Sequence, residues 1–259
     1  NRELIKTIYL QLSSLTKLRR FTFAFNLPYD DESWCLIRPL EILADSLSKL
    51  QLNFLHLSFM PVQVRYHNNF FNFFEKLQLK ELKDIKIDLY SEGGDDFKIY
   101  TYPFKFLEQG KLELLKKAHV LLSRKHSYGS MSKEHSSEIA KSLKKLNNIE
   151  ELIVEAKFID GLRVSEIAEA FNSLVNLKNL VIDTGTCRIT NQDFAYFIRS
   201  LPVLAKKLQE LKFDFSYAAN LTEETVLELK EILPELKELR TLEITIDSRK
   251  AGCCGDKAC

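Results

Sequence analysis

The sequence predicts an α/β solenoid in which one helix and one short strand repeat about eight times along the chain. Three observations support this prediction: strand-like pairs of apolar residues recur at similar intervals, leucines precede them at fixed spacing, and helical segments lie upstream. Hydrophobic residues make up 45% and charged residues 28% of the 259 positions, so the chain can fold. No single unit can bury its own apolar face, and the units must therefore stack.

Eight short segments each contain two apolar residues separated by one residue, as expected of strands with one buried face. These segments are Phe21-x-Phe23, Leu55-x-Leu57, Ile85-x-Ile87, Val120-x-Leu122, Leu152-x-Val154, Leu180-x-Ile182, Leu211-x-Phe213 and Leu242-x-Ile244. Their starts are about 32 residues apart on average. We expect the strands to stack in parallel about 4.8 Å apart, with helices covering the outer side.

Leucines before the strands repeat with the spacing L-x-x-L-x-x-L-x-L. The pattern runs through residues 12–23, 146–154, 174–182 and 233–244, with isoleucine or phenylalanine at some positions. Upstream of three strands, apolar residues fall on one face of a predicted helix. These helical stripes are Ile139, Leu143 and Leu146; Ile167, Phe171 and Leu174; and Val226, Leu229 and Leu233.

Capping residues mark where several of these helices begin. Thr190, followed by Asp193, is typical of a helix N-cap, and Thr222 precedes two glutamates that suit a first turn. Pro103 suits the first turn of another helix. The glycine- and aspartate-containing segment Tyr90–Tyr102 is expected to be a longer loop between units.

An aromatic run interrupts the leucine pattern in the third unit. Phe70, Phe71 and Phe74 fit one helical stripe, and Phe73 is expected to lie off it. The run predicts a phenylalanine-packed core; the alternative is an exposed patch for a partner on the convex side.

The combination of leucine spacing, strands and helices resembles the leucine-rich repeat family, and its ribonuclease-inhibitor-like branch in particular. The resemblance covers residues 1–247 and implies a horseshoe with a parallel concave sheet and helices on the convex side. The family usually places an asparagine shortly after each strand, and here only Asn26 matches, which suggests an irregular horseshoe. Residues 248–259 form a C-terminal tail outside the repeats, with three of the five cysteines.

Acidic residues gather at the strand positions that should face the concave surface. The position after the second apolar residue reads Ala24, Ser58, Asp88, Ser123, Glu155, Asp183, Asp214 and Thr245. Glu155, Asp183 and Asp214 come from consecutive strands and should form a row of carboxylates at strand spacing. The candidate protein-binding residues of the concave face are Asp88, Glu151, Glu155, Asp183, Glu210, Lys212, Asp214 and Glu243. The alternatives are an ordinary hydrated strand face or a metal site, for which no closed ligand shell is evident.

Other functional classes receive little support from the sequence. The net charge of +1 and the acidic inner face disfavour nucleic acid, and no run of about 18 apolar residues predicts a membrane span. The five histidines form no H-E-x-x-H motif, and His56 is expected on the concave face as a bystander. There is neither a phosphate-binding glycine loop nor a G-x-S-x-G turn. We therefore predict a protein that is not an enzyme, with no cofactor, no metal and no small-molecule ligand.

The resemblance implies that the protein binds other proteins. We predict a non-catalytic scaffold, a structural subunit of a multi-subunit complex, whose acidic concave face holds basic partner segments. The alternative is a regulatory inhibitor or activator that clamps a partner enzyme or small GTPase. The cysteine pattern shows no disulfide framework and favours an intracellular, cytoplasmic location, including a cytoskeletal, ciliary or organellar assembly.

Overall fold

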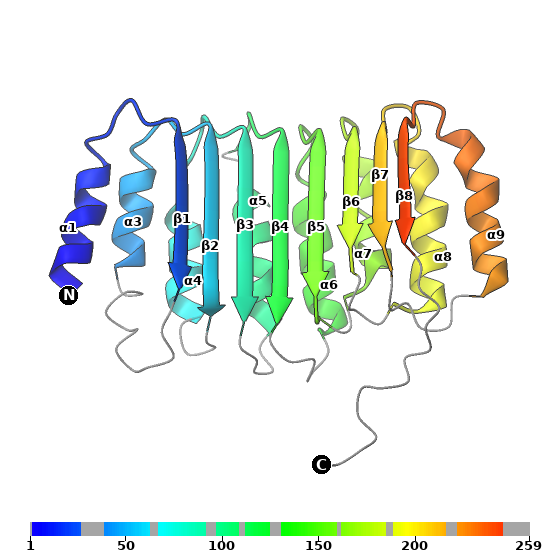
Figure 1. Ribbon diagram of the computed structural model, residues 1–259, viewed down its shortest axis with the longest axis horizontal. Helices are drawn as coiled ribbons and strands as arrows, with labels where there is room; N and C mark the ends of the chain where they lie inside the picture. The colour runs from blue at the N-terminus through cyan, green and yellow to red at the C-terminus, as the bar shows by residue number, and fades with distance from the viewer. Residues whose placement is uncertain are drawn as a thin grey trace, which may run out of the picture.

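The computed structural model describes residues 2–26, 39–62, 67–91, 97–108, 112–124, 131–159, 162–184, 189–215 and 222–245. Within these ranges the strands form one eight-stranded sheet in which they follow their order in the chain, and every neighbouring pair is parallel. Figure 1 shows the sheet in front and the helices behind it, side by side along the long axis. The predicted open α/β solenoid is confirmed.

Helices and strands alternate along the chain, so each unit is one helix followed by one strand. In order they are α1 (Arg2–Leu12), β1 (Arg20–Asn26), α3 (Leu40–Leu47), β2 (Phe54–Val62), α4 (His67–Lys76), β3 (Asp84–Ser91), α5 (Tyr102–Glu108), β4 (Lys117–Arg124), α6 (Lys133–Leu143), β5 (Glu151–Lys157), α7 (Val164–Ala168), β6 (Asn179–Asp183), α8 (Asn191–Ser200), β7 (Glu210–Asp214), α9 (Glu223–Ile232) and β8 (Thr241–Thr245). Short 3₁₀ helices η3 (Phe97–Thr101), η4 (Phe171–Ser173), η5 (Leu201–Leu204) and η6 (Leu233–Glu235) adjoin the helical layer. None of the helices in the described ranges is long and apolar enough to cross a membrane.

One backbone contact repeats between successive units, just before each strand. The carbonyl of Arg19 accepts from the N–H groups of Asn53 and Phe54, and the carbonyl of Asn53 accepts in turn from the next unit. The same arrangement continues through every unit to Gln209, whose carbonyl accepts from Arg240 and Thr241. This turn contact fixes the register in which each strand meets the next.

The register agrees with the predicted alignment except in the fourth unit. Ala118, and not Val120, pairs with Ile85 and Leu152. Apolar residues occupy alternate positions through this strand, so the pattern fits two alignments that differ by two residues. Leu121 therefore stands beside Asp88 and Glu155, where Ser123 was expected.

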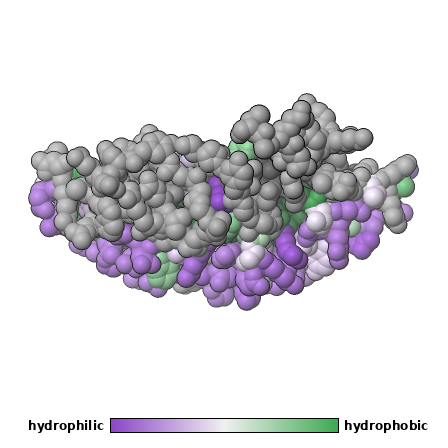
Figure 2. Space-filling view, turned by 90° about the horizontal axis from the view of Figure 1, so that it is seen from below, coloured by the Kyte–Doolittle hydropathy of each residue, from purple (hydrophilic) through white to green (hydrophobic). Residues whose placement is uncertain are grey.

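The strand residues that face the helices form one continuous core. Leu55, Ile85, Leu152, Leu180 and Leu211 are fully buried and belong to a single cluster that runs the length of the sheet. In Figure 2, the rim on the helical side bows outward and its described residues are mostly hydrophilic. The apolar rows are thus enclosed between a concave sheet and a water-facing helical layer.

The aromatic run of the third unit lies in this core. Phe70, Phe73 and Phe74 are buried, whereas Phe71 is only partly covered. The predicted core role is confirmed, but the expected stripe is wrong, because Phe73 faces inward. Phe73 packs edge-to-face on Phe59 of β2, with ring centroids 5.7 Å apart.

Three predicted helix starts are confirmed, among them Thr222, which directly precedes α9, and one predicted loop is shorter than expected. The Thr190 side chain accepts from the Asp193 N–H at 3.1 Å, and Pro103 lies in the first turn of α5. The predicted loop Tyr90–Tyr102 is shorter, because β3 continues to Ser91 and η3 begins at Phe97. The predicted tail at 248–259 lies outside the described residues.

The last unit is much less covered than the inner ones. Leu242 occupies the same register position as Leu211 but is 40% exposed, whereas Leu211 is 0% exposed. The reason is that no further unit follows β8 within the described part of the chain.

This difference predicts unequal effects of the same substitution. Leu211→Ala should lower the free energy of unfolding by about 3 kcal/mol, since it removes fully buried methyl groups and leaves a cavity. Leu242→Ala should lower it by about 1 kcal/mol or less, because a large part of that side chain is already in water. Urea denaturation of both variants measures the two values, and equal losses would contradict this description of the core.

Candidate protein-binding surface

The strand face opposite the helices carries the acidic residues singled out from the sequence. Glu155 of β5 pairs in register with Asp183 of β6, which pairs with Asp214 of β7. Side chains at one register position of neighbouring parallel strands lie side by side, about 4.8 Å apart. The structure therefore places these three carboxylates in one line, which we call the acidic row.

A lysine that was not singled out from the sequence lies within the acidic row. Lys157 Nζ is 3.1 Å from Glu155 Oε2 and 3.9 Å from Asp183 Oδ2. Its hydrogen bond to Glu155, helped by the charges of Glu155, Asp183 and Asp214, raises the pKa of Lys157. Lys157 follows Glu155 by two residues, so strand alternation alone could have placed it on this face.

A second cluster lies next to the row, towards the start of the last strands. Lys212 Nζ is 3.0 Å from Glu210 Oε1 and 3.5 Å from Glu243 Oε2. The hydrogen bond to Glu210 raises the pKa of Lys212. Glu151 is engaged elsewhere, by Lys117 Nζ of β4 at 2.8 Å.

The C-terminal half of the strand face is consequently acidic even after its lysines are counted. The exposed-face positions of β5 to β8 carry six carboxylates and two lysines. They are Glu151, Glu155, Asp183, Glu210, Asp214 and Glu243, with Lys157 and Lys212. Ile153 and Val181, both partly exposed, lie among them and give this half a small apolar centre.

The eighth candidate residue, Asp88, lies in the N-terminal half and is nearly buried. His56 Nε2 of β2 lies 2.8 Å from Asp88 Oδ2, and Lys86 Nζ lies 3.8 Å from Asp88 Oδ1. His56 lies on the strand face, as expected, and bonds the carboxylate on the next strand. Asp88 Oδ2 is bonded within the sheet, whereas the buried Oδ1 accepts no hydrogen bond from the described residues, and β4 separates Asp88 from the acidic row.

A second imidazole–carboxylate pair connects β4 to the acidic row. His119 Nε2 lies 2.7 Å from Glu155 Oε1. An ionised carboxylate only accepts hydrogen bonds, so this imidazole nitrogen must carry the proton. The hydrogen bond from His119, assisted by Lys157, lowers the pKa of Glu155 to about 2, although partial burial opposes the shift.

An exposed aromatic side chain follows directly on Lys157. Phe158 has a φ of 60°, in the left-handed region, and is 45% exposed. A residue with a Cβ atom in this conformation costs roughly 1–2 kcal/mol. Ile159, the next residue, is fully buried, so the left-handed residue ends β5 and returns the chain to the core.

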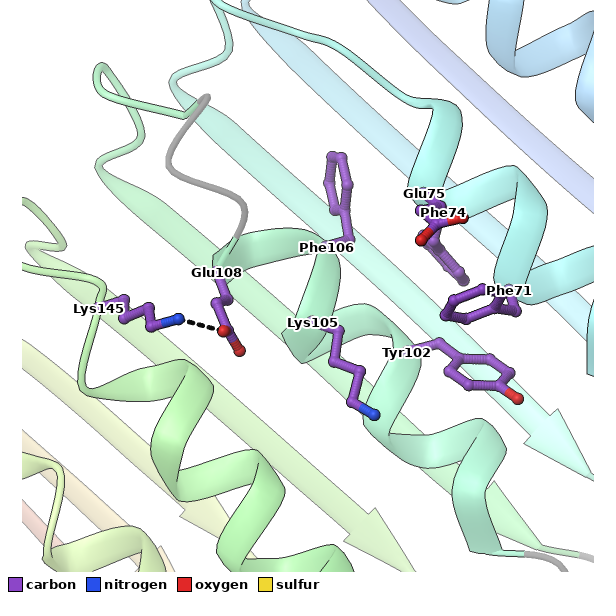
Figure 3. Close-up of a pocket in the computed structure, with 8 residues that line it drawn as sticks. All are labelled: Phe71, Phe74, Glu75, Tyr102, Lys105, Phe106, Glu108 and Lys145. Carbon is purple, nitrogen blue, oxygen red and sulfur yellow. Dashed lines mark hydrogen bonds and ion pairs between the residues drawn. The ribbon is translucent and has the colours of Figure 1, made fainter.

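Among the described residues of the helical side, one hollow of about 490 Å³ is lined in part by the aromatic run. It is lined by Phe71, Phe74, Glu75, Tyr102, Lys105, Phe106, Glu108 and Lys145 (Figure 3). Its charges are largely engaged: Lys145 pairs with Glu108, and Lys105 Nζ is 3.0 Å from Glu138 Oε2 of α6. The hollow therefore offers paired charges and packed rings, in contrast to the excess charge of the strand face.

No family model matches the chain, and no curated protein matches it. Within the described ranges, no three His, Cys, Asp or Glu side chains are placed to hold a metal ion. The arrangement on β5 to β8 is suited to binding cations on flexible stems, because carboxylate oxygens accept from lysine and arginine while apolar residues contact the stems.

The low pKa of Glu155 predicts a specific loss of stability in acid. Ionised Glu155 stabilises the fold fully above pH 4.5, its ordinary pKa, and this contribution is lost as the pH falls towards about 2. Glu155→Gln should cost about 1 kcal/mol of unfolding free energy at pH 7. Its stability should also change less than that of the wild type between pH 4.5 and 2.

Urea denaturation across this pH range measures both effects. Glu81→Gln is the matched control, because Glu81 is exposed on the turn before β3 and should behave like the wild type. Parallel stability curves for the wild type and Glu155→Gln would show that the bond between His119 and Glu155 contributes nothing.

Proposed function

We propose that this protein is a non-catalytic leucine-rich repeat scaffold that holds basic segments of partner proteins on the acidic half of its strand face. The observation that carries the proposal is the acidic row, surrounded on β5 to β8 by three further carboxylates and only two lysines. Family membership is inferred from the leucine spacing together with the helix–strand units. Such a protein would serve as a subunit of a larger assembly.

The composition of the surface favours a lysine- or arginine-rich ligand over other protein segments. Aliphatic stems of a bound segment would lie over Ile153 and Val181, while the cationic ends reach the carboxylates on either side. Excess negative charge also speeds the encounter with a basic partner and makes binding sensitive to salt.

Lys157 affects whether an arginine or a lysine of the partner binds better. It already donates to Glu155 and lies near Asp183, so a ligand has to share or displace this lysine. Arginine can do so more effectively than lysine, because its planar guanidinium forms two parallel bonds to one carboxylate. Phe158 adds an exposed ring at the end of β5, on which a guanidinium can stack.

Affinity purification from the native source, combined with cross-linking mass spectrometry, tests the proposal. The wild type should recover a defined set of partners whose basic segments cross-link near β5 to β8. Asp183→Lys/Asp214→Lys reverses two charges of the acidic row and should reduce recovery of these partners about tenfold or more, which corresponds to roughly 1.4 kcal/mol or more of binding free energy.

The matched control carries the same number of charge reversals away from the strand face. Glu81→Lys/Glu113→Lys alters two exposed residues on the turns before β3 and β4 and should recover the wild-type partners. Circular dichroism shows whether each variant is folded. If folded Asp183→Lys/Asp214→Lys recovers the same partners as the wild type, the acidic row is not the binding surface.

A further inference from the structure

The segments that lead from each helix to the next strand lie along one edge of the solenoid. Figure 1 shows them in a row above the strands, at nearly the same height, because the strands all run away from this edge. The bend of the molecule seen in Figure 2 lies in the plane of this edge and therefore does not move the segments out of it. The six inner segments, each with a unit on either side, are residues 48–53, 77–83, 112–116, 144–150, 169–178 and 201–209, which we call the turn edge.

Lysine is the dominant charged residue of the turn edge. Nine lysines and four glutamates lie in its segments: Lys49, Lys80, Lys83, Lys116, Lys144, Lys145, Lys178, Lys206 and Lys207, with Glu81, Glu113, Glu150 and Glu169. Four of the lysines are paired within the fold: Lys116 and Lys178 with Glu150, Lys144 with Glu169, and Lys145 with Glu108 of α5. Because two of these four lysines share one glutamate, the paired groups still carry one net positive charge.

The other five lysines of the turn edge make no ion pair with any described residue. They are Lys49, Lys80, Lys83, Lys206 and Lys207, and all five are exposed. The nearby carboxylates without a partner among the described residues are Glu81 and Glu113, and the adjoining helix ends add exposed Asp45, Glu75 and Lys141. When these groups and the paired ones are all counted, the surface keeps an excess of three positive charges.

Three aliphatic side chains project from the same edge into solvent. Leu114, Val175 and Val203 are 42%, 59% and 50% exposed. Leu114 and Val175 occupy turn positions that carry polar residues in most of the other inner units, so the buried rows do not require them there. Exposed aliphatic residues among lysines are typical of surfaces that bind the interface of a membrane.

We propose that the turn edge binds the surface of a membrane that contains anionic lipids. The uncompensated lysines would contact lipid phosphates, and the three aliphatic side chains would enter the boundary between headgroups and acyl chains. The turn edge extends for roughly 25 Å along the sheet, since its six units lie about 4.8 Å apart. Each lysine adds only a modest attraction, so binding requires many of them to act on one flat surface, which a bilayer provides.

The shape and composition of the turn edge favour a membrane over a nucleic acid. Single strands bind by stacking on exposed rings, and the one aromatic residue of these segments, Phe171, is 1% exposed. A duplex is a straight rod, and the bent edge seen in Figure 2 would touch it over only part of its length. A bilayer meets every segment of the edge and also accommodates the aliphatic side chains.

In this arrangement the strands stand upright on the membrane and the acidic row stays clear of it. Glu155 lies five residues beyond Glu150, so the acidic row is roughly 15 Å from the turn edge. Charges are screened over about 8 Å at physiological salt, so lipid phosphates repel the acidic row only weakly. The membrane contact does not rest on the proposed binding of basic segments, and it leaves that surface accessible.

Co-sedimentation with lipid vesicles tests the proposal. The wild type should bind vesicles of phosphatidylcholine with about 40% phosphatidylserine at least tenfold more tightly than pure phosphatidylcholine vesicles, and high salt should weaken this binding. Lys80→Gln/Lys83→Gln should bind the anionic vesicles about tenfold more weakly or worse, because it removes two uncompensated charges. Leu114→Ser/Val175→Ser should weaken binding by a similar factor, because it removes the inserted side chains.

The matched control removes two exposed lysines near the opposite edge, where the helices begin (Figure 1). Lys98→Gln/Lys133→Gln alters η3 and the start of α6 and should bind vesicles like the wild type. Circular dichroism shows whether each variant is folded.

Absence of binding to anionic vesicles, or equal binding to both kinds of vesicle, would overturn the proposal. Full binding by either folded turn-edge variant would also overturn it. If the wild type binds a short DNA duplex through Lys80 and Lys83 and binds no vesicles, the turn edge is a nucleic-acid surface instead. Asp183→Asn/Asp214→Asn should bind vesicles like the wild type, so failure of the acidic row and failure of this proposal are separate results.

Discussion

The turn contact between successive units is the constraint on which the rest of the structure depends. One carbonyl accepts two N–H groups of the next unit just before each strand begins, from Arg19 to Gln209. This fixes the parallel register, and with it the side of the sheet that each side chain occupies. Leucine and phenylalanine rows are thereby enclosed under the helices, and charged residues are aligned on the opposite face.

Alignment of like residues strengthens the core but places like charges together on the strand face. Two carboxylates about 5 Å apart repel by roughly 1 kcal/mol even in water, and more where solvent is partly excluded. Lys157 and His119 offset this repulsion at Glu155, which keeps its charge down to a pKa of about 2. The carboxylates of β6 to β8 have Lys157 and Lys212 nearby, and the remaining excess of negative charge favours a basic ligand.

Much of this arrangement could be predicted from the sequence, because aligning the repeats shows which residues occupy equivalent positions in successive units. The strand alignment was correct in seven units, so the line of Glu155, Asp183 and Asp214 followed directly. The fourth unit failed because apolar residues at 118, 120 and 122 fit two alignments. The pairing of His119 with Glu155 joins different register positions on adjacent strands, so the repeat alignment does not reveal it. The left-handed backbone of Phe158 could not be predicted either, because phenylalanine does not favour that conformation.

Binding of a short arginine- and lysine-rich peptide, followed by fluorescence anisotropy, tests the central claim most directly. The comparison is between the wild type and Asp183→Asn/Asp214→Asn, which removes two charges of the acidic row with little change in side-chain shape. We predict saturable binding that weakens with salt and becomes about tenfold weaker in the variant. Equal affinity for both proteins would contradict the claim that the strand register creates a binding surface for basic segments.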